Sequence, residues 1–203
     1  ERGGRIIYLV LDGLGGIPHP DRHVTELQAA KTPNLDALAQ ESSCGLLEIV
    51  GPGITPGSGP GHLTLFGYDP LKYRIGRGVL SALGIDFELQ PGDVAARVNF
   101  ATLGTDGKVD DRRAGRIDTE LNQELAQKIR DRVSLDFEGT FFFETVSEHR
   151  AVLVLRGDNL SGQIQDTDPQ STGIAPKPPK ATAPEGEKTA HLIQSFLRQV
   201  TEA

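Results

Sequence analysis

The sequence predicts an α/β chain with two parts: a parallel-sheet core and an α+β unit inserted into it. Two apolar, β-branched runs, at 5–11 and 45–50, enclose a helical segment that begins near Thr32. This β-α-β order favours a parallel sheet. Further along the chain the predicted strands follow one another, which is typical of an α+β unit. We therefore expect a core formed by 1–70 and 181–203 and an insert formed by 71–180.

The core elements rest on local signals. The run from Arg5 to Leu11 is almost continuously apolar, as a strand buried on both faces is. It ends at Asp12, and the glycines that follow allow a sharp turn. Thr32 is a good helix N-cap, and Pro33 suits the first helical position. Two strands are too few for a stable sheet, so we expect the remaining strands to lie beyond residue 203.

The insert has alternating and helical patterns. A strand is predicted from 93 to 103, a helix that Thr119 can cap, and a hairpin from 141 to 155. A proline-rich linker at 176–184 precedes a last helix at about 185–200. That helix carries an apolar stripe that needs a partner surface, formed by Leu192, Ile193, Phe196, Leu197 and Val200.

Composition excludes several classes of protein. The formal charge of −7, without a basic block, argues against nucleic acid as the main partner, although a local arginine cluster can still hold a small anion. The longest apolar stretch is too short to span a bilayer, so no membrane partner is expected. The single cysteine excludes an intramolecular disulfide. No signal peptide is visible, and the cytoplasm is the expected location.

Asp12 and Ser58 are the first candidates for chemistry. Both follow predicted strands, and the carboxyl ends of parallel strands are where ligands bind. Ser58 lies in a loop at 51–61 made mostly of glycine and proline, which exposes its hydroxyl. A divalent metal held by Asp12 could coordinate the Ser58 oxygen and activate it, with His62 within reach. The alternatives are an ordinary turn aspartate and a solvated loop serine.

A second candidate group lies in the insert. Arg112, Arg113 and Arg116 place three guanidiniums in one short segment, and arginine binds phosphate and carboxylate through two parallel hydrogen bonds. A solvated basic turn is the alternative. Asp166 and Asp168 could pair with these arginines, hold substrate hydroxyls, or form a simple polar turn.

Six segments together resemble the archaeal-type, cofactor-independent phosphoglycerate mutases of the alkaline phosphatase superfamily. The long glycine- and proline-rich loop is the most specific of them, whereas the Asp-Gly start is shared across the superfamily. The segments are 10–16, 32–36, 51–62, 66–70, 112–117 and 166–170.

The resemblance implies a glycolytic isomerase that interconverts 3-phosphoglycerate and 2-phosphoglycerate through a phosphoserine. It implies two divalent metal ions (Mn, Mg, Zn or Co), no 2,3-bisphosphoglycerate, and a substrate-binding lid inserted into a phosphatase-like core. Asp12 and Ser58 become metal ligands, and Ser58 becomes the nucleophile. The predicted contacts of the phosphorylated three-carbon acid are His62, Arg112, Arg113, Arg116, Arg156, Asp166 and Asp168.

The family's other metal ligands lie in a C-terminal half, and nothing after residue 185 resembles them. We therefore expect that the missing half, or another chain, supplies these ligands. Two alternatives stay open from the sequence: another metal-dependent phosphomutase or phosphatase of the superfamily, and an inactive anion-binding fragment of such an enzyme.

Overall fold

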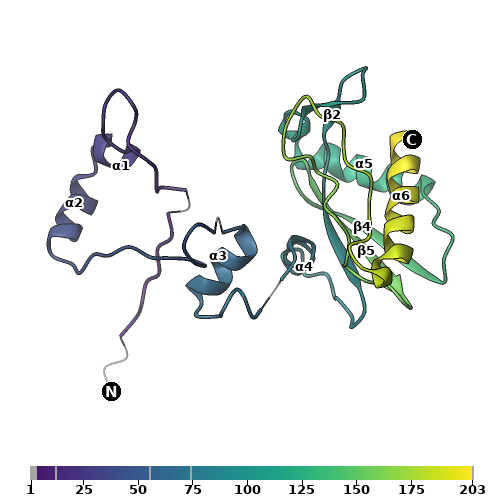
Figure 1. Cartoon of the computed structure of the whole chain (residues 1–203), viewed down its shortest axis with the longest axis horizontal. Coiled ribbons are helices and arrows are strands. Elements are labelled where there is room, and N and C mark those ends of the chain that lie inside the picture. The colour runs from purple at the N-terminus through teal and green to yellow at the C-terminus, as the bar shows by residue number, and fades with distance from the viewer. Residues whose placement is uncertain (1–3, 12, 55, 74, 203) are drawn as a thin grey trace. The chain divides into compact units, whose positions relative to one another are not determined.

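A computed structural model describes residues 4–11, 13–54, 56–73 and 75–202 (Figure 1). The chain divides into two compact units, Glu1–Glu48 and Ile49–Ala203. Among the described residues, no helix is long and apolar enough to cross a membrane.

The first unit contains two short helices joined by extended chain. Helix α1 (Glu26–Ala29) begins with a capping box, in which Thr25 and Gln28 bond each other's backbone N–H. Helix α2 (Pro33–Gln40) begins at the predicted proline. The Thr32 hydroxyl does not cap the backbone of α2, because it donates to the Asp36 carboxylate at 3.0 Å instead.

The two runs predicted as parallel strands, 5–11 and 45–50, are not strands in the described part of the chain, so these predictions are wrong. Their apolar side chains are exposed: Ile6 is 94%, Leu9 74% and Leu46 105% accessible. An extended segment becomes a strand only when a neighbour accepts its backbone hydrogen bonds. No described segment provides such a neighbour for either run.

The second unit is built on an antiparallel sheet. Its strands are β1 (Val94–Asn99), β4 (Gly139–Ser147) and β5 (Arg150–Gly157), in the spatial order β1-β5-β4. The predicted strand and hairpin are thereby confirmed. A separate ladder joins β2 (Thr102–Leu103) to β3 (Val109–Asp111). Together these elements form a mixed helix and strand unit with a small antiparallel sheet.

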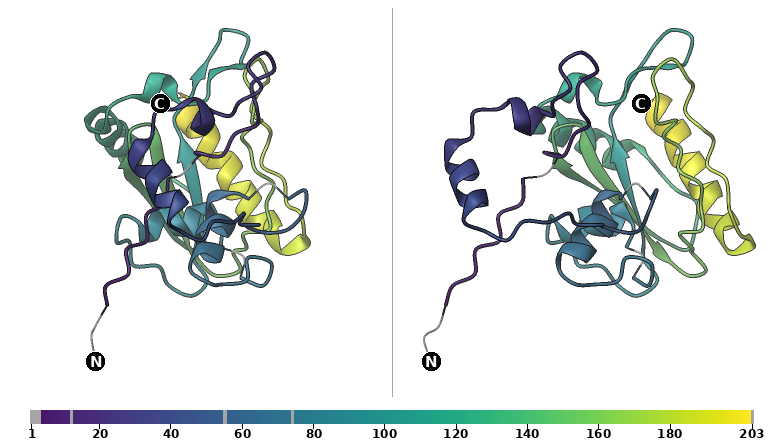
Figure 2. Two further views of the ribbon diagram at one scale, coloured as in Figure 1. Left: turned by 90° about the vertical axis from the view of Figure 1, so that its left-hand side faces the viewer. Right: turned by 60° about the vertical axis from the view of Figure 1, so that its left-hand side comes forward.

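Helices cover both faces of this sheet (Figures 1 and 2). Helices α5 (Thr119–Arg132) and α6 (Glu187–Glu202) share one apolar core with β4 and β5. Helix α4 (Arg77–Leu83) packs on the opposite face. Helix α3 (Ser58–Leu65) contacts α4, and two 3-10 turns occur at Ala114–Arg116 and Pro184–Gly186.

The apolar stripe of α6 packs against strand β4. Leu192 is 7% and Phe196 1% accessible, and the Phe196 ring lies 5.5 Å from the Phe143 ring of β4. The periodicity predicted the stripe but not its partner, because β4 is more than one element away along the chain. The helix therefore packs with the sheet of the second unit.

Asp118, rather than Thr119, caps α5. The Asp118 carboxylate accepts the Leu121 N–H at 2.7 Å. Thr119 is the first helical residue, and its hydroxyl accepts the Glu148 N–H of the β4–β5 turn at 3.1 Å. The cap and the neighbouring hydroxyl thus fix α5 against the hairpin, next to the site described below.

Candidate anion-binding site

A cavity of about 170 Å³ lies in the second unit and is lined mainly by guanidinium groups. Its volume is below the roughly 300–1,000 Å³ of pockets for drug-sized ligands, which suits a small ligand. We call it the arginine cavity. Its lining residues are Arg77, Arg97, Asn99, Arg112, Arg113, His149 and Arg150.

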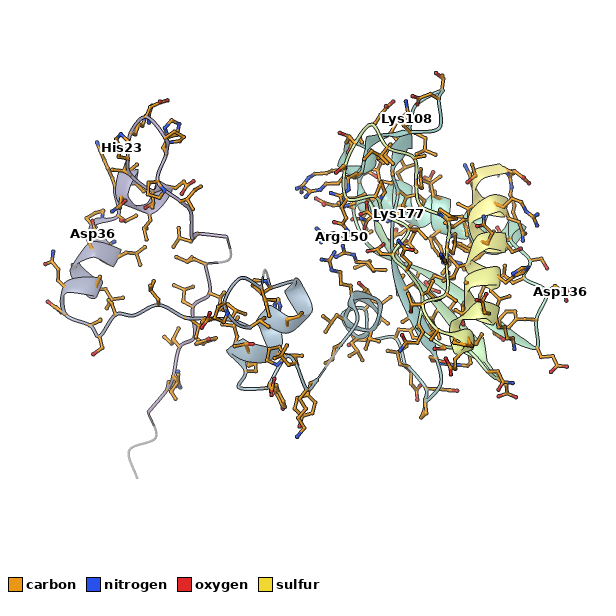
Figure 3. All side chains as sticks on the ribbon, viewed as in Figure 1. His23, Asp36, Lys108, Asp136, Arg150 and Lys177 are labelled. Carbon is orange, nitrogen blue, oxygen red and sulfur yellow. The ribbon has the colours of Figure 1, made fainter. Side chains whose placement is uncertain are left out.

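Strand register places three of these side chains on the α4 face of the sheet. Arg97 and Asn99 follow Ala95 at alternate positions in β1, so they share its face. Ala95 packs in the apolar cluster under α4. Arg150 lies directly opposite Asn99 in β5, and opposite residues of paired strands point to the same side. Figure 3 shows the Arg150 side chain on the α4 side of the sheet.

Helix α4 brings Arg77 to the same place. Arg77 is the first residue of α4, and the next residue, Gly78, is buried against β1. A Cβ at Gly78 would overlap the Ala95 carbonyl group, so only glycine allows this close packing of helix on strand. The close contact holds the start of α4 beside Arg97.

The end of β3 supplies Arg112 and Arg113 from a turn that Asp111 holds. The Asp111 carboxylate accepts the N–H groups of Arg113 at 2.8 Å and Gly115 at 2.7 Å. The following residues Ala114, Gly115 and Arg116 all have positive φ, of 47°, 64° and 56°. Side-chain residues rarely adopt this left-handed conformation, so the turn is strained and its two carboxylate hydrogen bonds help to maintain it.

Positive charge is concentrated in the arginine cavity. Burial lowers the pKa of the Arg97 guanidinium, and the charges of Arg77 and Arg150 lower it further. The hydrogen bonds of Arg112 with Asp168 raise the pKa of the Arg112 guanidinium. Such crowding of like charges costs free energy, and a bound anion would offset that cost.

His149 is the buried polar group of the site, at 2% accessibility. Burial lowers the pKa of its imidazole, and the Arg150 charge lowers it further, although Glu148 acts in the opposite direction. The imidazole is therefore neutral near pH 7.

This burial predicts a pH dependence of stability. The folded-state pKa of His149 lies below its unfolded value of about 6.5, so the unfolded chain binds the proton more readily. The free energy of unfolding should therefore fall as the pH drops from about 7.5 to about 5.5, and His149→Gln should reduce this fall. Urea unfolding at both pH values measures it. An identical pH dependence in the variant would contradict the assignment.

The two predicted metal-site residues are only partly described. Asp12 lies outside the described residues, as does the side chain of Ser58. The backbone of Ser58 begins α3. A Cβ on the preceding residue, Gly57, would lie 3.7 Å from Nη2 of Arg77, so the start of α3 adjoins a residue of the arginine cavity.

The predicted substrate contacts fall in different places. Arg112 and Arg113 line the arginine cavity, whereas Arg116 does not and lies 3.6 Å from the Glu148 carboxylate. His62 lies in α3 and lines a different, apolar cavity of about 490 Å³. Its other lining residues are Gly59, Leu63, Phe66, Tyr68 and Leu80.

The two predicted aspartates lie beside the arginine cavity. Asp168 pairs with Arg112 through two hydrogen bonds, of 3.0 and 2.6 Å, which is one of the alternatives that the sequence left open. Asp166 accepts the Asp168 N–H at 3.0 Å, as in a polar turn. The negative charges of Asp166 and Asp168 also raise the pKa of the Arg97 guanidinium, against the larger lowering by burial.

Arg156 lies outside the cavity and joins β5 to the chain before β1. Its guanidinium binds the Asp93 carboxylate at 2.9 and 2.7 Å and lies 5.1 Å from the centre of the Phe142 ring. The Asp93 side chain is only 2% accessible. The Arg156 hydrogen bond holds the pKa of Asp93 below its usual range.

This arrangement predicts a role in stability for Arg156. Arg156→Ala should lower the free energy of unfolding, because it leaves the Asp93 carboxylate buried without its partner. Urea unfolding at neutral pH measures the change. Arg198→Ala, on the exposed surface of α6, is the control and should change stability by less than about 0.5 kcal/mol. Equal effects of the two substitutions would contradict the prediction.

Five residues of the cavity were not predicted from the sequence: Arg77, Arg97, Asn99, His149 and Arg150. One signal was available. Arg97 and Asn99 are polar residues at alternate positions of an otherwise apolar strand, which indicates a polar patch on one face of a sheet.

The described residues do not provide a metal site. Among them, no group of three or more His, Cys, Asp or Glu side chains could hold a metal ion. The two-metal site that the resemblance implies therefore has no complete ligand set in the described part of the chain. Asp12 and Ser58 remain predicted ligands.

Comparisons with known proteins agree with the resemblance. Residues 39–203 match the family model of 2,3-bisphosphoglycerate-independent phosphoglycerate mutase. A probable mutase of this kind from Thermus thermophilus is 51% identical over 198 residues, which are 98% of this chain and 49% of the relative. One from Deinococcus radiodurans is 53% identical over 203 residues, with 98% and 49% covered.

A solved structure gives a similar result. The cofactor-independent phosphoglycerate mutase from Thermoplasma acidophilum matches with a TM-score of 0.58 and 43% identity, over 95% of this chain and 50% of that one. The chain thus spans about half the length of the curated relatives it matches.

Proposed function

Because this chain belongs to the family of 2,3-bisphosphoglycerate-independent phosphoglycerate mutases, we propose that it is half of an enzyme that interconverts 3-phosphoglycerate and 2-phosphoglycerate. The arginine cavity is the observation that carries this proposal. Both phosphoglycerates present a phosphate and a carboxylate on a three-carbon frame. Five guanidiniums line this small cavity, and among the described residues only one of them forms a bidentate pair with a carboxylate. Such a cavity suits a compact polyanion.

In the proposed reaction Ser58 carries the phosphoryl group. The Ser58 hydroxyl loses its proton as its oxygen attacks the phosphorus of 3-phosphoglycerate, the bond from phosphorus to the C3 oxygen breaks, and the C3 oxygen takes up a proton. The 2-hydroxyl then loses its proton and attacks the phosphoserine, which forms 2-phosphoglycerate and releases the Ser58 oxygen to take up a proton. Proximity between the start of α3 and Arg77 supports a guanidinium beside the transferred phosphate, where it would stabilise the spread negative charge.

We also propose the division of the chain expected from the sequence, with one change. Residues 1–70 would contribute to a phosphatase-like core, and 71–180 would form the substrate-binding insert. The packing of α6 against β4 supports moving Glu187–Glu202 from the core to the insert. The exposed apolar side chains of the runs at 5–11 and 45–50 would be covered by the remainder of the complete enzyme. Two divalent metals would bind Asp12, Ser58 and ligands outside this chain.

A comparison of the 203-residue chain with the complete enzyme tests the proposed function. The 203-residue chain alone should show no mutase turnover in an assay coupled to enolase, and the complete enzyme encoded by the same reading frame should show it. The physical reason is that Asp12 and Ser58 are too few ligands for two metals. Turnover by the chain alone would contradict the division of the site. A complete enzyme that turns over neither phosphoglycerate would contradict the proposed activity.

A further inference from the structure

Two buried polar atoms in the arginine cavity are unsatisfied. They are Oδ1 of Asn99 and Nδ1 of His149, and neither has a hydrogen-bond partner among the residues that the structure describes. The Glu148 carboxylate lies 3.8 Å from Nδ1 of His149, beyond hydrogen-bond distance. Buried polar atoms are rarely left without partners, so each requires an explanation.

Both atoms come from one end of the sheet. Asn99 is the last residue of β1, and His149 lies in the turn that joins β4 to β5. Phe100, which follows Asn99, donates its backbone N–H to the His149 carbonyl at 2.8 Å. This backbone hydrogen bond fixes the end of β1 to the β4–β5 turn. The positions of both side chains are therefore set by the sheet rather than by a free loop.

Oδ1 of Asn99 and Nδ1 of His149 require a different kind of hydrogen-bonding group from the anion that the arginines bind. Guanidiniums only donate hydrogen bonds and select anions, whereas the Asn99 oxygen only accepts. An anionic oxygen cannot satisfy it, because such an oxygen has no proton to donate. A hydroxyl can, since it donates one hydrogen bond and accepts others, and it can also bond either tautomer of the neutral His149 imidazole.

Resting on the proposed function, we infer that Asn99 and His149 form a subsite for the free hydroxyl of the phosphoglycerate. In 3-phosphoglycerate this is the 2-hydroxyl, and in 2-phosphoglycerate it is the 3-hydroxyl. The arginines hold the charged groups, and the two polar side chains hold the group that next receives the phosphoryl. Asn99 and His149 are thus positioning residues that distinguish a hydroxylated phospho-acid from an otherwise identical one.

The subsite predicts a preference that charge alone does not give. A site built to bond a hydroxyl rejects an analogue that lacks it, because the buried polar atoms stay unpaired. We expect the 203-residue chain to bind 3-phosphoglycerate at least about tenfold more tightly than 3-phosphooxypropanoate, which has the same charged groups but no 2-hydroxyl. Isothermal titration calorimetry with each compound measures the difference.

Substitutions distinguish the contribution of the hydroxyl subsite to affinity from the contribution of the arginines. Asn99→Leu, which keeps the approximate shape of the side chain, should lower affinity for 3-phosphoglycerate to that for the analogue and leave affinity for the analogue unchanged. Arg97→Gln should weaken both ligands by a similar factor. Arg198→Gln, on exposed α6, should change neither. Thermal unfolding of each variant checks that it is folded.

The outcomes are distinct. Equal binding of the two compounds by the unsubstituted chain overturns the hydroxyl subsite while leaving the anion site intact, and this result requires no variant. A loss of both affinities in Asn99→Leu, with the fold retained, also overturns it. Failure of the unsubstituted chain to bind either compound contradicts the proposed function of the cavity itself.

Discussion

Ser58→Ala should abolish mutase turnover of the complete enzyme, with a loss of roughly 10⁴-fold or more. Alanine has no oxygen to accept the phosphoryl group, and no other serine in the described part of the chain begins a helix beside the arginine cavity. The assay coupled to enolase measures the loss. Rapid quench with substrate labelled in the phosphate should trap label on Ser58 in the unsubstituted enzyme and none in the variant.

The control for this substitution is Ser134→Ala. Ser134 is exposed, follows α5, and uses only its backbone groups in its bonds with Gln199. It should keep full turnover and full labelling. Retained turnover in Ser58→Ala would show that another group carries the phosphoryl, even if the arginine cavity still binds the substrate.

Arg97→Gln should weaken binding of 3-phosphoglycerate to the 203-residue chain by roughly 30- to 150-fold, or about 2–3 kcal/mol. Arg97 is half-buried in β1, and its hydrogen bonds to an anion would be shielded from water. Glutamine is polar but shorter and neutral, and it lacks the planar fork of donors. Calorimetric titration measures the change, with Arg198→Gln as the matched control.

The same substitution should not destabilise the unliganded chain. Burial and the charges of Arg77 and Arg150 all disfavour the charged form of Arg97, so neutral glutamine removes an unfavourable interaction. We therefore expect the free energy of unfolding to stay constant or rise while affinity falls. A loss of stability together with an unchanged affinity would instead make Arg97 a structural residue of the sheet.

The insert could be predicted from sequence because its signals are local. The hairpin at 141–155 and the helix at Thr119 have all their pattern residues close together in the chain. The runs at 5–11 and 45–50 have equally clear patterns, yet they form no strand in the described structure. A strand depends on partners for its hydrogen bonds, and a local pattern does not contain those partners.

The candidate site also contains some residues that a local motif predicts and others that only the fold brings together. Arg112 and Arg113 were predictable as a clustered motif, and Asp168 as an acid of a separate polar turn 56 residues away that the structure pairs with Arg112. Arg77 and Arg150 are single charges in the sequence. Only the register of β1 with β5 and the close packing of Gly78 bring them together. Long-range register of this kind is not encoded in any short segment.

The strand order β1-β5-β4 also bears on how the unit folds. Strands β4 and β5 are joined by a turn of two residues, so their hairpin closes at little entropic cost. Strand β1 must reach β5 across the intervening α5 and β4, and such distant pairings form more slowly. We expect the hairpin to form early and β1 to dock late. Since Arg97 and Asn99 come from β1, and Arg150 from β5, partly folded chains would contain the hairpin but no anion site. Ligand affinity would then appear only with the last step of folding, and a bound anion would act mainly by slowing the detachment of β1.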